Sequence, residues 1–292
     1  MNTSLEHLSA TKRGQLKVIT RIIAKAIRPE KIILFGTHGS IDGGTEMWTD
    51  KQLMHCMSSF DLLIVTRRGE RRYDHEIQDI IENRCRTHTP VTVLIHDIDY
   101  VNKRLVGGHY FFSMMSREAI LLYDAGNVPL ALASLPDLPK IKETAQKDFE
   151  NWRGSANAYF KSAVFNLYEK EFKVAIFLLH QAAERIYQAI LLTFTGYKPC
   201  THNLDKLRRY TNRFSIELAM LFPRNTKEED DLFKLLLQGY VDARYCDEYQ
   251  ITEEEVTLLI ERIARLMSIA DRVCKNRFVS LDKMASDASA AI

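Results

Sequence analysis

The chain lacks closely spaced cysteines, an excess of one charge and any long apolar run. Its five cysteines lie far apart with no C-x-x-C pair, which argues against a zinc site or a disulfide framework and is typical of a reducing compartment. Its 40 basic and 38 acidic residues nearly cancel, so any site for a polyanion must be local. No apolar run approaches the ~18 residues that span a bilayer, and the polar N-terminus has no signal-peptide core. We therefore expect a cytoplasmic protein with no membrane partner.

Glycine becomes rare after residue 127, where only three of the 12 glycines lie and where Leu, Ala, Glu and Lys recur at helical spacing. A chain of 292 residues exceeds the size at which one core usually keeps growing, so two domains are expected. Three prolines, Pro129, Pro136 and Pro139, disfavour helix between them. We expect a first domain over 1–126, a linker over 127–140, a helical bundle over 141–280 and a frayed tail over 281–292.

The first domain is expected to be α+β, with a short mixed sheet and helices. A helix is predicted over 16–27, strands over 31–35, 61–66 and 91–96, and a polar helix over 73–84. The second domain is expected to be an all-α antiparallel bundle, with helices over 152–168 and 172–195. Capping boxes at Thr226-x-x-Glu229 and Thr252-x-x-Glu255 mark two further helix starts.

The first predicted strand ends in Gly36-Thr37, where backbone amides and a hydroxyl can bind a phosphate group. Without other support, a plain strand-terminating turn explains the same residues. Asp61 opens an otherwise apolar strand, where a charge needs solvent, a cation or a metal beside it. Asp61 is the best candidate for a metal ligand, with an exposed strand end or a turn cap as the alternative.

The segments LFGT (34–37) and SSFDLLIV (58–65) together resemble the minimal polymerase-beta-like nucleotidyltransferases. The resemblance implies that Gly36, Thr37 and Ser59 bind a nucleoside triphosphate and that Asp61 holds Mg²⁺ and serves as the catalytic carboxylate. In that family, a second carboxylate two residues before the position of Asp61 and a third on a neighbouring strand complete the site. Here Ser59 occupies the second position.

The third predicted strand supplies no replacement carboxylate, because Thr92, Leu94 and His96 share one face and only Asp97 and Asp99 follow near its end. Glu46 and Asp50 in the long loop are other candidates. The set of three carboxylates is therefore expected to be incomplete. This loss should impair two-metal catalysis more than it impairs nucleotide binding. The segment GGHYFFSMMSREAILLYD (107–124) also resembles these fused nucleotidyltransferases, and its apolar residues are expected in the core.

The second half resembles HEPN domains at HQAAERIY (180–187), GY (196–197), HNL (202–204) and YVDARY (240–245). Many members are ribonucleases that place a histidine four to six residues after an arginine. Arg244 is present, but residues 249–251 are Tyr, Gln and Ile, so we expect no ribonuclease activity of the usual type. Arg244 would bind a phosphate, or alternatively cap a helix and pair with Asp247 or Glu248. His180 and Glu184 have the i, i+4 spacing of a metal pair but lack a third ligand nearby in sequence.

Three functions follow from these patterns. The first is a nucleotidyltransferase-like/HEPN fusion that binds a nucleoside triphosphate with Mg²⁺ and transfers the nucleoside monophosphate to a hydroxyl of RNA or protein. The second is a catalytically degenerate nucleotide sensor or interaction protein of a toxin–antitoxin or defence type. The third, an antibiotic nucleotidyltransferase, requires a complete carboxylate set. The basic runs at 67–72 and 208–213 could contact RNA, and the bundle could form a homodimer.

Overall fold

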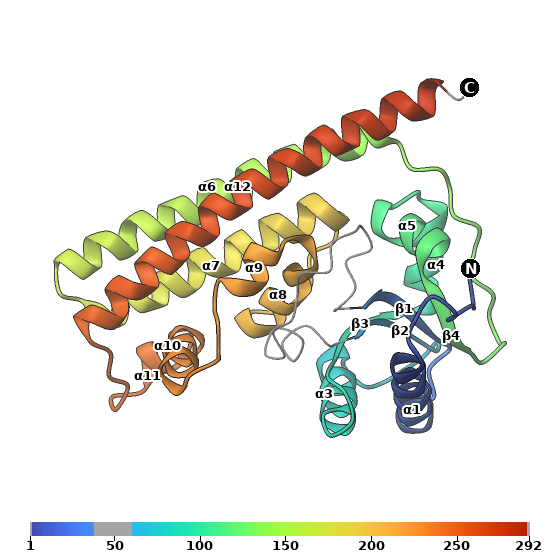
Figure 1. Ribbon diagram of the computed structural model, residues 1–292, viewed down its shortest axis with the longest axis horizontal. Helices are drawn as coiled ribbons and strands as arrows, with labels where there is room; N and C mark the ends of the chain where they lie inside the picture. Colours follow the sequence, from blue (N-terminus) through green and yellow to red (C-terminus); the bar gives the residue numbers. More distant parts are fainter. Residues whose placement is uncertain (1, 38–59, 291–292) are drawn as a thin grey trace. The chain divides into compact units, whose positions relative to one another are not determined.

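The computed structural model describes residues 2–37 and 60–290, apart from the side chains of residues 37, 288 and 289. The chain divides into two compact units, Met1–Pro136 and Asp137–Ile292 (Figure 1). Within the described residues, no helix is both long and apolar enough to cross a membrane. The two units are described separately.

The N-terminal unit is built on a mixed sheet of four strands in the order β3-β2-β1-β4. The strands are β1 (Lys31–Thr37), β2 (Phe60–Thr66), β3 (Val91–Asp97) and β4 (Ile120–Asp124). β1 pairs antiparallel with both β2 and β4, whereas β2 and β3 are parallel and are connected through α3 (Asp74–Cys85). The expected short mixed sheet is confirmed, with β4 as a strand that periodicity did not identify.

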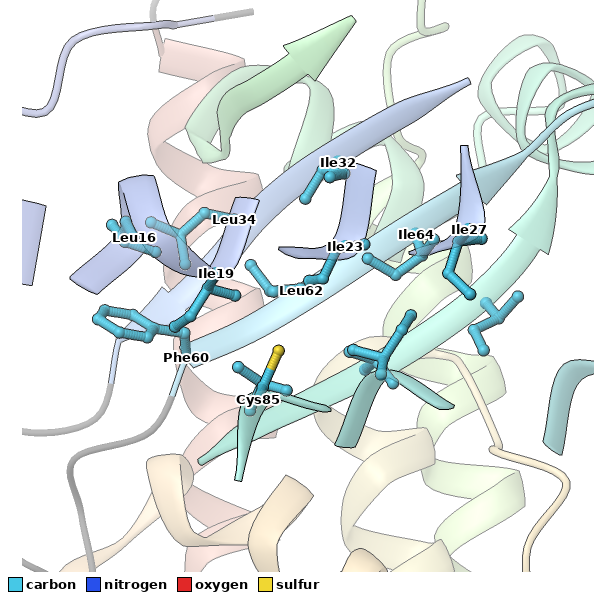
Figure 2. Packing of buried hydrophobic residues seen from close by; sticks show 14 of the residues in the cluster. Leu16, Ile19, Ile23, Ile27, Ile32, Leu34, Phe60, Leu62, Ile64 and Cys85 are labelled. Atoms are coloured by element: carbon cyan, nitrogen blue, oxygen red, sulfur yellow. The ribbon is translucent and has the colours of Figure 1, made fainter. Parts of the chain in front are cut away.

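Helix α1 (Ala10–Ile27) and α3 cover one face of this sheet (Figure 1). The helix places Leu16, Ile19, Ile23 and Ile27 at 3.6-residue spacing on the alternate strand residues Ile32, Leu34, Phe60, Leu62 and Ile64 (Figure 2). Burying each aliphatic side chain of α1 contributes about 2 kcal/mol relative to leaving it in water. This apolar face therefore fixes the register of the strands that carry the predicted site.

The opposite face of the sheet packs against α4 (Ile98–Val106) and α5 (Tyr110–Glu118). Phe111 makes an edge contact with Phe35 of β1, at 5.6 Å between ring centroids, and Phe112 makes one with His96 of β3 at 5.7 Å. Tyr110, Phe111 and Phe112 are all buried. The aromatic run therefore belongs to the core, as expected.

The end of β4 and the residues that follow it bind to the start of β1 through hydrogen bonds and an ion pair. The Glu30 carboxylate accepts hydrogen bonds from the backbone of Asn127 and Val128, and Lys31 forms a 2.6 Å ion pair with Asp124. Glu30 and Lys31 are almost completely buried. Residues 124–128, which include the beginning of the expected linker, thus pack on the N-terminal unit.

The C-terminal unit is helical throughout its regular elements, in agreement with the expected bundle. Its long helices are α6 (Leu138–Tyr168), α7 (Phe172–Thr195) and α12 (Glu253–Ala290), and its shorter ones are α8 (Leu204–Thr211), η1 (Asn212–Phe214), α9 (Ile216–Met220), α10 (Lys227–Gln238) and α11 (Asp242–Tyr245). α6 and α12 are antiparallel, because Lys142 pairs with Asp282 and Arg153 with Asp271. Helix α12 includes residues 281–290 of the segment that was expected to fray.

The helix boundaries follow the local signals in most places. Both capping boxes form: Glu229 N–H donates to Thr226 Oγ1 at 3.2 Å, and Glu255 N–H donates to Thr252 Oγ1 at 3.2 Å. Gly196 ends α7 in the left-handed region at φ 62°. Helix α6, however, begins at Leu138 inside the expected linker, because Pro139 lies in its first turn, where no amide donor is needed.

Candidate functional site

The predicted phosphate and metal residues Gly36 and Asp61 are direct neighbours across β1 and β2. The register pairs them, after an irregularity in β1 between Leu34 and Gly36. A Cβ atom built on Gly36 would lie 2.5 Å from Asp61 Oδ2, so only glycine leaves room for this carboxylate. Asp61 itself is 1% exposed. The close approach of the Asp61 side chain thus explains why glycine occupies position 36, which the sequence alone did not show.

The neighbouring strand places Thr92 beside Asp61. The parallel register of β2 and β3 pairs these two residues, and both are buried. Thr92 Oγ1 has no hydrogen-bond partner within residues 2–37 and 60–290. A hydroxyl therefore stands at the position on β3 where the nucleotidyltransferase resemblance would seek a carboxylate.

The two acidic residues near the end of β3 cannot join Asp61. Asp97 lies five residues beyond Thr92, a separation of about 16 Å along a strand. Its side chain caps α4 by accepting a hydrogen bond from Tyr100 N at 2.9 Å. Asp99 forms a bidentate ion pair with Arg68. Both carboxylates thus have structural roles at the opposite end of the sheet.

The remaining predicted residues of this site are not described. Ser59, Glu46 and Asp50 lie outside the described residues, as does the side chain of Thr37. Within the described part of the chain, no group of three or more His, Cys, Asp and Glu side chains could hold a metal ion. The described ligand atoms at this end of the sheet are therefore the carboxylate of Asp61, beside Gly36, and the hydroxyl of Thr92, beside Asp61.

A polar cleft of about 520 Å³ lies at the carboxyl ends of β2 and β3. Its lining includes Arg67, Asp74, His96 and Asp97. Burial lowers the pKa of His96 to about 4, so its imidazole is neutral near pH 7. Burial, together with the charge of Asp97, raises the pKa of Asp74. The sequence did not identify this cleft, because its residues meet only through the parallel pairing of β2 and β3.

In the C-terminal unit, Arg244 lies among three aromatic rings. Its guanidinium carbon is 4.9 Å from the ring centroid of Phe177, 4.8 Å from Tyr240 and 4.9 Å from Tyr245. Its Nε donates to the Tyr240 carbonyl at 2.7 Å. Tyr240 lies in the turn between α10 and α11, and the described residues give Arg244 no ion pair with Asp247 or Glu248. The aromatic rings are a contact that the sequence did not predict.

Two histidines share the Tyr240 ring with Arg244. His180 and His202 stack on it at 5.1 Å and 5.5 Å between centroids. His202 Nδ1 also contacts the buried carboxylate of Glu184 at 3.1 Å, while its side chain stays 65% exposed. The loop after α7 thus brings His202 onto the same aromatic ring that Arg244 contacts, an arrangement that no spacing in the sequence indicates.

His180 has a structural environment. Its Nδ1 lies 2.9 Å from the Leu236 carbonyl, and burial lowers its pKa below the ordinary range. His180 and Glu184 do not belong to any metal-binding group among the described residues. Both side chains are buried and contact other residues of the C-terminal unit, His180 the Leu236 carbonyl and Glu184 the imidazole of His202.

Tyr249, at the position where a ribonuclease would carry histidine, is 7% exposed. Its hydroxyl donates to the Leu235 carbonyl at 2.9 Å. Burial raises the pKa of Tyr249 well above the ordinary value for tyrosine. This hydroxyl is therefore a poor general base near neutral pH.

Comparison with known proteins identifies the C-terminal unit. No curated protein matches the chain. A family model described as HEPN domain matches residues 149–273, from α6 into α12. The matched segment includes Arg244, Tyr240 and the His202–Glu184 pair, and it does not extend into the N-terminal unit. The chain thus carries a HEPN domain at residues 149–273.

Proposed function

We propose that the N-terminal unit is a nucleotidyltransferase-like module that binds a nucleoside triphosphate, in the same chain as the HEPN domain. The observation that carries the proposal is the pairing of Gly36 with Asp61, which puts a buried carboxylate against the backbone where β1 ends. Backbone amides at such a turn can bind phosphate oxygens, and the nearby carboxylate favours a cation between the two.

The described donors fit one magnesium ion that is held mainly by the substrate. Asp61 would supply a carboxylate oxygen and Thr92 a hydroxyl, with phosphate oxygens and water completing the set. Magnesium, when bound, would neutralise the charge of the phosphates. A two-metal centre needs a second carboxylate, which the described residues do not place beside Asp61.

Transfer of a nucleoside monophosphate to a hydroxyl of RNA or protein is the activity we propose to test first. The full chain would be incubated with Mg²⁺ and labelled ATP or GTP, and labelled protein and RNA would be separated on gels. Asp61→Asn keeps the side-chain shape but removes the charge, and we expect it to abolish labelling. Asp99→Asn, which alters an exposed ion pair, is the matched control and should label normally. Equal labelling by both variants would exclude the role proposed for Asp61.

A second candidate, a nucleotide sensor without turnover, is favoured by Thr92 beside Asp61. In this proposal the N-terminal unit binds the triphosphate and alters the HEPN domain, as part of a toxin–antitoxin-like or defence function. Calorimetric titration of the full chain with a triphosphate and Mg²⁺ separates the candidates. Binding without labelling supports the sensor, whereas absence of binding rejects both functions. If Asp61→Asn binds the triphosphate with unchanged affinity, the nucleotide site does not lie at Gly36 and Asp61.

A further inference from the structure

The Trp152 side chain of α6 lies between two positive charges from different segments. The Arg185 guanidinium carbon of α7 is 4.6 Å from the Trp152 ring centroid, and Lys198 Nζ, in the loop after α7, is 5.3 Å from it. Each cation is attracted to the face of the ring, but two like charges on one ring repel each other. A negative charge placed near both cations would offset this repulsion.

No carboxylate of the described chain supplies that charge. Arg185 and Lys198 form no ion pair within residues 2–37 and 60–290, whereas Arg153, one residue beyond Trp152, pairs with Asp271 at 2.7 Å. Asp148, one turn before Trp152, has a raised pKa because of its burial, and the cation that counteracts this effect is Lys147. The two cations at Trp152 are thus left for a ligand.

Arg185 and Gln181, both on α7, each carry a buried hydrogen-bond donor. Arg185 Nε and Gln181 Nε2 are shielded from water and have no hydrogen-bond partner among the described residues. Residues 181 and 185 lie on one face of α7 because they are four positions apart. A buried donor without an acceptor is destabilising, because it has lost its hydrogen bond to water. The cluster offers donors and cations, so its missing partner is an anion with several oxygens.

We propose that Trp152, Arg185 and Lys198, with Gln181, form a binding site for a phosphate group. The guanidinium of Arg185 can bind two phosphate oxygens through parallel hydrogen bonds, and Lys198 is exposed, so the ligand reaches the site from solvent. The phosphate belongs to a free nucleotide or to an RNA backbone. The site is independent of the proposed function of the N-terminal unit, because all four residues lie in the C-terminal unit.

Tryptophan fluorescence of the full chain tests the site directly. Trp48 and Trp152 are the two tryptophans, so Trp48→Phe leaves Trp152 as the sole reporter. Inorganic phosphate should change its emission in a saturable way, with sodium chloride at matched ionic strength as the reference. Lys198→Gln should weaken phosphate binding about tenfold, as expected for loss of one charged hydrogen bond. Lys161→Gln removes an equal charge from an exposed position on α6 and should leave the affinity unchanged.

Arg185→Lys keeps the charge but removes the planar fork, and we expect it to weaken binding as well. The same titrations with AMP and with a 12-nucleotide RNA distinguish the source of the phosphate. Tighter binding of RNA, falling steeply with salt, indicates a backbone site, and equal binding of AMP and phosphate indicates a nucleotide site. An emission change no larger with phosphate than with chloride, or equal affinities of Lys198→Gln and Lys161→Gln, overturns the proposal. Asp61→Asn should not alter these affinities.

Discussion

Replacing Gly36 by alanine tests the closest contact of the predicted nucleotide site. The new Cβ would lie 2.5 Å from Asp61 Oδ2 and 3.2 Å from Asp61 Cβ and Cγ. Because Asp61 is buried between paired strands, the carboxylate has little space to move. Overpacking of this kind costs about 1–3 kcal/mol. We expect Gly36→Ala to lower the melting temperature of the N-terminal unit by about 4 °C per kcal/mol.

Hydrogen exchange of peptides from β2, followed across a urea series, reports the stability of this unit separately from the bundle. Gly14→Ala is the matched control, because a Cβ at Gly14 of α1 meets no atom within 4 Å. That change should stabilise α1 by about 0.5–1 kcal/mol. The cost of Gly36→Ala should also shrink in an Asp61→Ala background. If Gly36→Ala costs nothing, or costs the same in both backgrounds, the carboxylate does not lie over Gly36.

Three further predictions concern other buried groups. Burial lowers the pKa of His96 to about 4 in the folded protein, so as pH falls from about 6.5 the imidazole is protonated in the unfolded chain before it is protonated in the folded one. The free energy of unfolding should therefore fall by about 2–3 kcal/mol between pH 6.5 and 4. Urea unfolding of His96→Gln should lose that pH dependence. Tyr249→Phe removes one of the two hydrogen bonds that the Leu235 carbonyl accepts, the other coming from Gly239 N–H, and should destabilise the bundle by about 1 kcal/mol in urea unfolding, whereas no change would show that water replaces the hydroxyl. Gly239→Ala puts a Cβ 2.9 Å from Ile176 Cγ1 and should lower the bundle's melting temperature, since α7 and α10 would have to separate; an unchanged value would contradict that packing.

The secondary structure of the chain could be predicted well where local signals decide it. Helix α7 occupies the predicted range 172–195 because its apolar face and Gly196 both define it. The strands β1, β2 and β3 follow from short apolar runs that end in polar residues. Helix α6 was predicted too short, because Pro139 interrupts most helices but is tolerated in the first turn.

Contacts between distant segments could not be predicted in the same way. β4 follows α5 directly, so its pairing with β1 depends on tertiary structure rather than on its own pattern. The pairing of Gly36 with Asp61 depends on register, and the stacking of His202 on Tyr240 depends on the loop after α7. The residue types of the predicted sites were visible in the sequence, but their partners were not.

The two units share one feature: in each, the residues proposed to bind phosphate lack a neighbouring group that the resembled family uses for catalysis. Asp61 and Gly36 are adjacent, yet Thr92 stands where a carboxylate would be sought. Arg244 is held among aromatic rings, yet the buried Tyr249 replaces histidine. Binding depends on static charges and donors, whereas turnover also needs a group that changes its protonation state near neutral pH. In the HEPN domain, the exposed His202 contacts Glu184 and stacks on the same Tyr240 ring as Arg244, so ribonuclease assays of the full chain should compare His202→Ala with Arg244→Ala.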